Sequence, residues 1–126
     1  MNFASIRIIT NDIKGMVEFY AAITGLAPNW YTDDFAELKT PSCTLAIASQ
    51  RTLAFFPKNA ISTATNRSAI IEFRVDDVDA EYAKSKALIG DLVQPPTTMP
   101  WGNRSMLFRD PDGNLINFFA PVSVAA

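Results

Sequence analysis

Apolar positions at the start of the chain follow first a strand pattern and then a helix pattern. Residues 3–10 are rich in apolar and β-branched side chains, which predicts a β-strand. Asn11 or Asp12 then caps a helix, and Gly25 stands where a left-handed residue would end it. The helix itself is predicted from an apolar stripe at helical spacing, which comprises Ile13, Met16, Val17, Tyr20 and Ile23.

The rest of the chain continues as short strands and then repeats the same order. The segment 58–68 is rich in Ser, Thr and Asn without a hydrophobic period, so it is interpreted as a linker. In the second half, Asp76 and Asp77 crowd a helix start, and that helix is predicted to reach Ile89 and to close at Gly90. The predicted strands are 29–32, 35–39, 44–49, 69–75, 92–98, 103–108 and 115–119, with a helical turn over 50–56.

The two halves align residue by residue, which indicates an internal repeat. An offset of 65 brings Ile6 onto Ile71, and the same offset brings Asp12 onto Asp77. An offset of 70 is needed further on, where Leu38, Pro41 and Leu45 fall on Phe108, Pro111 and Leu115. The difference of five residues is assigned to a longer connection in the second half, around 94–99.

Composition narrows the class of protein. The chain has 126 residues, of which 48% are hydrophobic and 19% charged, and this supplies the core of one ordinary domain. A net charge of -2 without a basic run excludes the usual signature of a nucleic-acid or anionic-membrane partner. The start of the chain has no signal-peptide pattern, and one cysteine suits a reducing compartment, so a cytoplasmic location is expected. No histidine is present, so any chemistry must proceed without the commonest metal ligand and general base.

The order of the motifs resembles the vicinal oxygen chelate superfamily, which includes glyoxalases, bleomycin-resistance proteins and extradiol dioxygenases. The resemblance rests on the segments Ser5–Asp12, Ile70–Asp77, Pro100–Arg104 and Phe108–Asn114. It implies an α+β fold in which two tandem βαβββ modules form a curled mixed sheet around a cavity, with helices on the outer face. It also implies a homodimer. The expected organisation is one domain over 1–126, with module one at 1–57, a linker at 58–68 and module two at 69–126.

Family enzymes hold a divalent metal in this cavity, with a His on the first strand of each module and a carboxylate on the last strand. Aligned on the capping aspartates, the first-strand positions hold Ser5 and Ile70, and the last-strand positions hold Asn117 and Ile47. These side chains offer no charge and little donor strength to a divalent ion. No metal and no cofactor are therefore expected, and the metal-free branch of drug-binding proteins is the closer comparison.

Strand alternation predicts which side chains face the cavity. Arg7 and Glu72 occupy equivalent positions in the repeat, and a charge in a half-buried cavity rarely stays unpaired, so they are expected to form an ion pair. That pair either neutralises itself or holds a polar group of a ligand. The inward set is Phe3, Ser5, Arg7, Ile47, Ser49, Ile70, Glu72, Arg74, Leu115, Asn117 and Phe119.

Aromatic residues are the remaining candidates for the site. Trp30, Tyr31, Phe35, Trp101 and Phe119 either form stacking walls for a flat ligand or belong to the core or a dimer interface. Trp30 and Trp101 are favoured, since both flank loops near the expected cavity mouth. Arg104 either complements an anionic ligand or pairs with a surface carboxylate. The predicted ligand-binding residues are Ser5, Arg7, Trp30, Ile47, Ile70, Glu72, Trp101, Arg104, Asn117 and Phe119.

Three functions remain open at this level. The first is a metal-independent small-molecule binding protein with an aromatic or apolar ligand. The second is a metal-independent lyase or isomerase that uses Glu72 as its base, since burial raises the pKa of a carboxylate and a neighbouring Arg7 lowers it again. The third is an interaction module whose cavity has collapsed around Ile47, Ile70 and Phe119.

Overall fold

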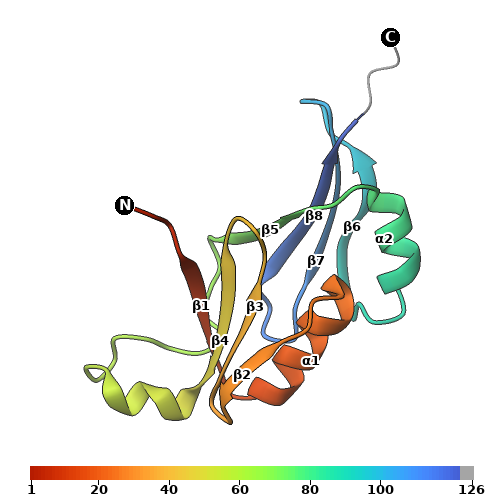
Figure 1. Ribbon diagram of the computed structural model, residues 1–126. Coiled ribbons are helices and arrows are strands. Elements are labelled where there is room, and N and C mark those ends of the chain that lie inside the picture. The colour runs from red at the N-terminus through yellow and green to blue at the C-terminus, as the bar shows by residue number, and fades with distance from the viewer. Residues whose placement is uncertain (123–126) are drawn as a thin grey trace. The chain divides into compact units, whose positions relative to one another are not determined.

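A computed structural model describes residues 1–122, and the last four residues of the predicted second module, 123–126, lie outside the described residues. The chain divides into two compact units, Met1–Thr65 and the segment from Asn66 onward. In Figure 1 the first unit runs from red through yellow and the second from green to blue.

The first unit is a four-stranded mixed sheet with one helix. The strand order is β1-β4-β3-β2, with β1 parallel to β4 and the other neighbours antiparallel. A 3-10 helix, η1, follows the last strand. The elements are β1 (Ser5–Thr10), α1 (Ile13–Thr24), β2 (Asn29–Thr32), β3 (Phe35–Lys39), β4 (Thr44–Ser49) and η1 (Gln50–Phe55).

The second unit repeats this topology in the order β5-β8-β7-β6, with β5 parallel to β8. The predicted α+β fold of two tandem βαβββ modules is therefore confirmed. The extra length of the second half lies in β6, whose pairing with β7 shifts register twice. The elements are β5 (Ile70–Arg74), α2 (Val78–Ser85), β6 (Asp91–Thr98), β7 (Asn103–Arg109) and β8 (Leu115–Pro121).

The helix caps follow the sequence in the first unit and depart from it in the second. Asp12 accepts a hydrogen bond from the Gly15 amide at 3.0 Å, and Gly25 ends α1 in the left-handed region at φ 72°. In the second unit Asp77 caps α2, but the helix ends at Ser85 and Gly90 has no positive φ. The prediction of a helix to Ile89 was wrong, because only two side chains of α2 are buried and no apolar stripe continues beyond them.

Strand register defines two faces of each sheet. In the first unit Ile47 pairs with Ile8 and with Ala36, so these three side chains share one face. We call it the helix-covered face, because α1 contacts β1, β3 and β4, and because Ala36 and Ile47 are buried there and Ile8 is half-buried. The opposite one is the helix-free face. The fully buried strand residues of the two helix-covered faces are Thr10, Ala36, Leu38, Ile47, Met106, Phe108, Ile116 and Phe118.

Among residues 1–122, no helix has the length and apolar character needed to cross a membrane.

Candidate functional site on the helix-free faces

The helix-free face of the first unit carries a cluster of two aromatic rings and two cations. The guanidinium carbon of Arg7 lies 5.1 Å from the ring centroid of Phe35, and the Tyr31 ring lies 5.8 Å from the same centroid. Lys39 Nζ lies 5.9 Å from the Tyr31 ring centroid. Hydrogen bonding to Tyr31 raises the pKa of Lys39 above its ordinary range, so this side chain stays charged. Arg7, Tyr31, Phe35 and Lys39 form what we call the aromatic–cation cluster.

Two alanines on the neighbouring strand β4 form the floor beside this cluster. Ala46 pairs with Arg7 on one side, and Ala48 pairs with Phe35. Both alanines are buried, because their methyl groups project less than the side chains around them. Ser5 lies on the same face, two residues before Arg7 along β1, and is exposed. Ser5 and Arg7 therefore share the face of β1 opposite Ile8, and their contact with a ligand stays a prediction.

The helix-free face of the second unit carries a polar network instead. Ser105 Oγ donates to Asn117 Oδ1 at 2.5 Å, and Asn117 Nδ2 donates to Glu72 Oε2 at 2.8 Å. Register places Glu72 directly beside Asn117 in the parallel pair of β5 and β8. Ile70 and Phe119 lie on the same face, and Ile70 is exposed while Phe119 is half-buried. The Asn117 amide is thus oriented by a partner on each side.

The placement of Ile47 on the cavity side was wrong. Its side chain is 0% exposed and lies on the helix-covered face with Ile8 and Ala36. The turn between β3 and β4 spans 40–43, whereas the turn between β7 and β8 spans 110–114 and is one residue longer. The offset between the last strands is therefore 117 − 46 = 71, and Ala46 is the counterpart of Asn117.

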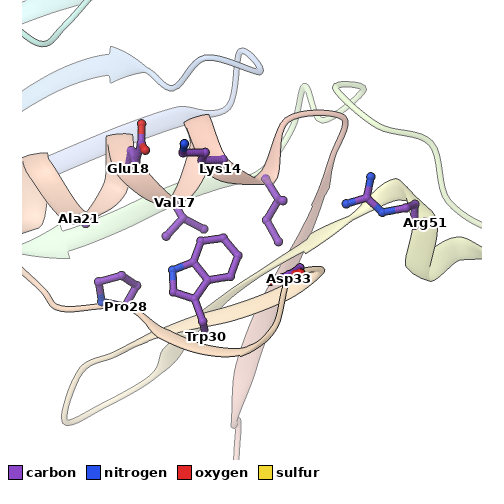
Figure 2. Close-up of a pocket in the computed structure, with 9 residues that line it drawn as sticks. Lys14, Val17, Glu18, Ala21, Pro28, Trp30, Asp33 and Arg51 are labelled. Atoms are coloured by element: carbon purple, nitrogen blue, oxygen red, sulfur yellow. The ribbon is translucent and has the colours of Figure 1, made fainter.

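Trp30 was favoured because it flanks a loop near the expected cavity mouth, and the structure places it on the helix-covered face. It pairs with Ala36 on the helix-covered face, at the edge strand β2. Its indole lines a groove of about 560 Å³ between β2 and α1, where it faces Val17 (Figure 2). The groove is closed at one end by Arg51, whose Nε donates to Asp34 Oδ1 at 2.7 Å. Trp30 is therefore a groove residue on the side of the sheet opposite the aromatic–cation cluster.

The two remaining predicted residues occupy the second unit. Trp101 stands in the turn between β6 and β7 and is 71% exposed. Arg104 forms a bidentate pair with Asp79 of α2, with Nε–Oδ2 at 3.0 Å and Nη2–Oδ1 at 2.8 Å. This contact holds the pKa of Asp79 below its ordinary value of 3.8. Of the two alternatives for Arg104, the structure shows the pairing with a surface carboxylate.

The donor set at the family's metal positions does not fit a divalent ion. Ser5 and Ala46 stand at these positions in the first unit, and Ile70 and Asn117 stand there in the second. A methyl and a sec-butyl group cannot ligate, and the Asn117 amide already bonds to Ser105 and Glu72. Within the described part of the chain, no group of three or more His, Cys, Asp or Glu side chains is placed to hold a metal.

Sequence reasoning missed Lys39 and Ser105, and it left the pairing of Arg7 with Glu72 as a prediction. Lys39 has the same strand parity as Phe35, so alternation along 35–39 was a sufficient signal for it. Ser105 carries no signal of its own, since its role depends on the register between β7 and β8. The Arg7–Glu72 ion pair remains a prediction, because each residue is described within its own unit.

Comparison with known proteins agrees with this architecture. Residues 2–118 match the family model described as the Glyoxalase/Bleomycin resistance protein/Dioxygenase superfamily. The uncharacterized protein YraH of Bacillus subtilis (strain 168) is 29% identical over 126 residues, with 94% of this chain and 98% of YraH covered.

Two solved structures show the same fold. A glyoxalase/bleomycin resistance protein/dioxygenase family enzyme from Burkholderia phytofirmans PsJN has a TM-score of 0.86 at 18% identity, covering 97% of this chain and 100% of its own. Lactoylglutathione lyase from Agrobacterium tumefaciens has a TM-score of 0.72 at 21% identity, covering 93% and 91%. The family match over nearly the whole chain, on two βαβββ units, places this protein in the glyoxalase/bleomycin resistance protein/dioxygenase superfamily.

Proposed function

We propose that the protein binds a small aromatic or apolar molecule without the help of a metal ion. The aromatic–cation cluster on the helix-free face of the first unit is the observation that carries this proposal. A flat ring stacks favourably on the exposed parts of Phe35 and Tyr31. A polar or anionic substituent of the same ligand would meet Arg7 and Lys39, both of which are cationic at neutral pH.

The floor beside the cluster supports the same proposal. Ala46 and Ala48 project only methyl groups, so the larger side chains of Arg7 and Phe35 stand above them. Both methyl groups are already buried, so the apolar surface that a ligand would remove from water, at about 25 cal/mol for each Å², is that of Tyr31 and Phe35. The Ser5 hydroxyl adds a donor and acceptor at the exposed end of β1.

The second unit contributes its own proposed ligand contacts. Ile70 and Phe119 supply apolar surface on its helix-free face, while Glu72 and Asn117 supply a carboxylate and an oriented amide. Trp101 is proposed as a contact from the exposed turn. Arg104 is withdrawn from this set, because its Nε and Nη2 groups donate to Asp79 and its Nη1 group donates to Thr98 Oγ1.

A thermal-shift screen tests the proposal. The purified protein is heated with flat aromatic compounds, including antibiotics because the family contains bleomycin-resistance proteins, and with divalent metals or EDTA. A compound that binds the native state raises Tm according to RT ln(1 + [L]/Kd). We expect stabilisation by an aromatic compound that EDTA does not abolish. Stabilisation by a divalent metal that EDTA reverses would overturn the metal-independent assignment.

Matched arginine variants locate the site. Arg7→Ala removes the cation above Phe35, and we expect it to weaken ligand binding about tenfold. Arg67→Ala removes an equally exposed arginine from the connecting segment and should leave the Kd unchanged. Equal losses in the two variants would show that the ligand responds to overall charge rather than to the aromatic–cation cluster.

A second candidate function is favoured by one contact. The exposed Glu72 carboxylate is oriented by Asn117 Nδ2, which suits a general base in a metal-independent lyase or isomerase. Turnover of a hemithioacetal by EDTA-treated protein, lost in Glu72→Gln, would support this function. Unchanged turnover in the variant, or none in the parent, would exclude Glu72 as the base.

The protein is also proposed to form a homodimer, as the family resemblance implies. Sedimentation velocity distinguishes the dimer from a single chain of 13.9 kDa. A mass that stays at the single-chain value across the accessible concentrations would rule the dimer out.

A further inference from the structure

The groove between α1 and β2 is separate from the proposed ligand face. It lies on the helix-covered side of the first sheet, whereas Arg7 and Phe35 lie on the helix-free side. Val17 and Ala21 of the helix form one wall, and Pro28 and Trp30 form the other (Figure 2). Its volume of about 560 Å³ is in the ordinary range for a small-molecule site.

Trp30 dominates the apolar part of this groove. The indole is 45% exposed although it stands on the face that elsewhere forms the core, beside the fully buried Ala36. It lies at the edge strand, so one of its ring faces has no neighbouring strand to cover it. A flat ligand that enters between this ring and the α1 wall would bury aromatic and aliphatic surface together.

The rim of the groove carries more unpaired negative than positive charge. Arg51 and Asp34 neutralise one another, since Arg51 Nε donates to Asp34 Oδ1 at 2.7 Å. Asp34 does not itself line the groove, and the charged lining residues besides Arg51 are one cation, Lys14, and two anions, Glu18 and Asp33. Within residues 1–122, none of these three takes part in an ion pair of the structure. The rim therefore favours a cationic ligand.

We propose that this groove binds a flat aromatic cation. The ring of the ligand stacks on Trp30, which has the most favourable aromatic face for a positive charge. The cationic nitrogen group lies toward Asp33 at the rim, and Glu18 adds to the negative potential from the helix. The Arg51–Asp34 pair closes the end of the groove without contributing net charge.

Tryptophan NMR with three isosteric probes tests this proposal. The chain has two tryptophans, so Trp101→Phe leaves a single indole Nε1–H signal, that of Trp30. The probes are benzamidinium, benzamide and benzoate, which share one size and differ in charge. We expect a saturable shift of the Trp30 signal that is strongest with benzamidinium and weakest with benzoate. No saturable shift at millimolar benzamidinium, or equal affinity for benzoate, would overturn the proposal.

Two carboxylate variants assign the charge preference. Asp33→Asn should weaken benzamidinium binding about threefold to tenfold and leave benzamide binding unchanged. Asp76→Asn removes an exposed carboxylate from the second unit and serves as the matched control, with no expected change. Undiminished benzamidinium binding in Asp33→Asn would remove Asp33 from the site.

The same titration separates this groove from the proposed ligand face. Arg7→Ala should not change the response of the Trp30 signal to benzamidinium, because Arg7 lies on the other side of the sheet. A parallel loss in Arg7→Ala would show that benzamidinium binds at the aromatic–cation cluster instead. Failure of the aromatic screen on the helix-free face would leave the groove result unaffected.

Discussion

The two helix-free faces sit on one backbone plan and carry opposite chemistry. In the first unit a large Phe35 stands beside the small Ala48, whereas in the second unit a small Ser105 stands beside the large Phe119. The register is the same in both cases, since each pair joins the third strand of its module to the last. Each pair therefore combines one large and one small side chain. The large side chain comes from the third strand of the module in the first unit and from the last strand in the second.

Charge and polarity are exchanged as well. Arg7 in the first unit corresponds to Glu72 in the second, and Ala46 corresponds to Asn117. By contrast, the helix-covered faces of both units are apolar and buried at the centres of the two inner strands of each sheet. The buried face specifies the βαβββ fold, whereas the side chains of the helix-free face differ in charge and polarity between the two repeats. Substitutions that give the helix-free face of one unit the residues of the other unit test this difference between the buried and the helix-free faces.

The largest effect is expected from Ala48→Phe, which adds the phenyl ring of the second unit without removing Phe35. Ala48 is 0% exposed, so overpacking should cost about 1–3 kcal/mol and lower Tm by roughly 4 °C for each kcal/mol. Urea unfolding measures the loss. Ala69→Phe, at an exposed position before β5, is the matched control and should be near neutral.

The double variant Phe35→Ser with Ala48→Phe transplants the second unit's arrangement. We expect it to recover part of the stability lost in Ala48→Phe, because the two positions pair directly and their effects should couple. Recovery stays incomplete, since the contacts of Phe35 with Arg7 and Tyr31 are lost. Simple addition of the two single effects would contradict the size exchange.

A smaller effect is expected from the polar network that only the second unit has. Asn117→Ala leaves the buried Ser105 hydroxyl without its partner and should destabilise the protein by about 1–2 kcal/mol. Adding Ser105→Ala should cost little more, since the unsatisfied hydroxyl is then gone. Urea unfolding of both single variants and the double variant completes the cycle. Asn29→Ala, an exposed amide on β2, is the control, and additive losses at Ser105 and Asn117 would argue against the network.

Much of this architecture could be predicted from local patterns. The caps at Asp12 and Asp77 and the end of α1 at Gly25 depend on residues that lie next to one another in the sequence. The repeat could be aligned for the same reason, because each capping aspartate is followed by its helix. Such features can be predicted from a single helix or strand, without knowing how the elements pack together.

The face on which a site residue lies could be predicted only where it depends on alternation along a single strand. Parity along β1 puts Ser5 and Arg7 on the face opposite Ile8, as the register shows, but Ile47 was assigned across a turn whose length differs by one residue between the units. A slip of one residue moves a side chain to the opposite face of a strand. Trp30 was chosen because it flanks a loop, and the groove that it lines depends on how α1 packs against β2, which the sequence pattern does not reveal.

The smallest effects on stability are expected from an ion pair that each unit has on its surface, between an aspartate and an arginine. Arg104 lowers the pKa of Asp79, and Arg51, with help from Ser49, lowers the pKa of Asp34. A folded-state pKa below the ordinary 3.8 adds stability that is present above pH 3.8 and lost as the pH falls through the lowered value. Asp79→Asn should therefore lower Tm slightly at pH 7, and the difference from the parent should shrink below pH 3.8.

Asp34→Asn should show the same pH dependence with a larger amplitude. Asp34 also accepts a hydrogen bond from the buried Ser49 hydroxyl at 2.8 Å, whereas Asp79 is paired with an arginine alone. Asp76→Asn, the exposed control, should leave Tm unchanged at either pH. Equal amplitudes at Asp34 and Asp79 would mean that the hydrogen bond from Ser49 adds nothing to the effect of the arginine.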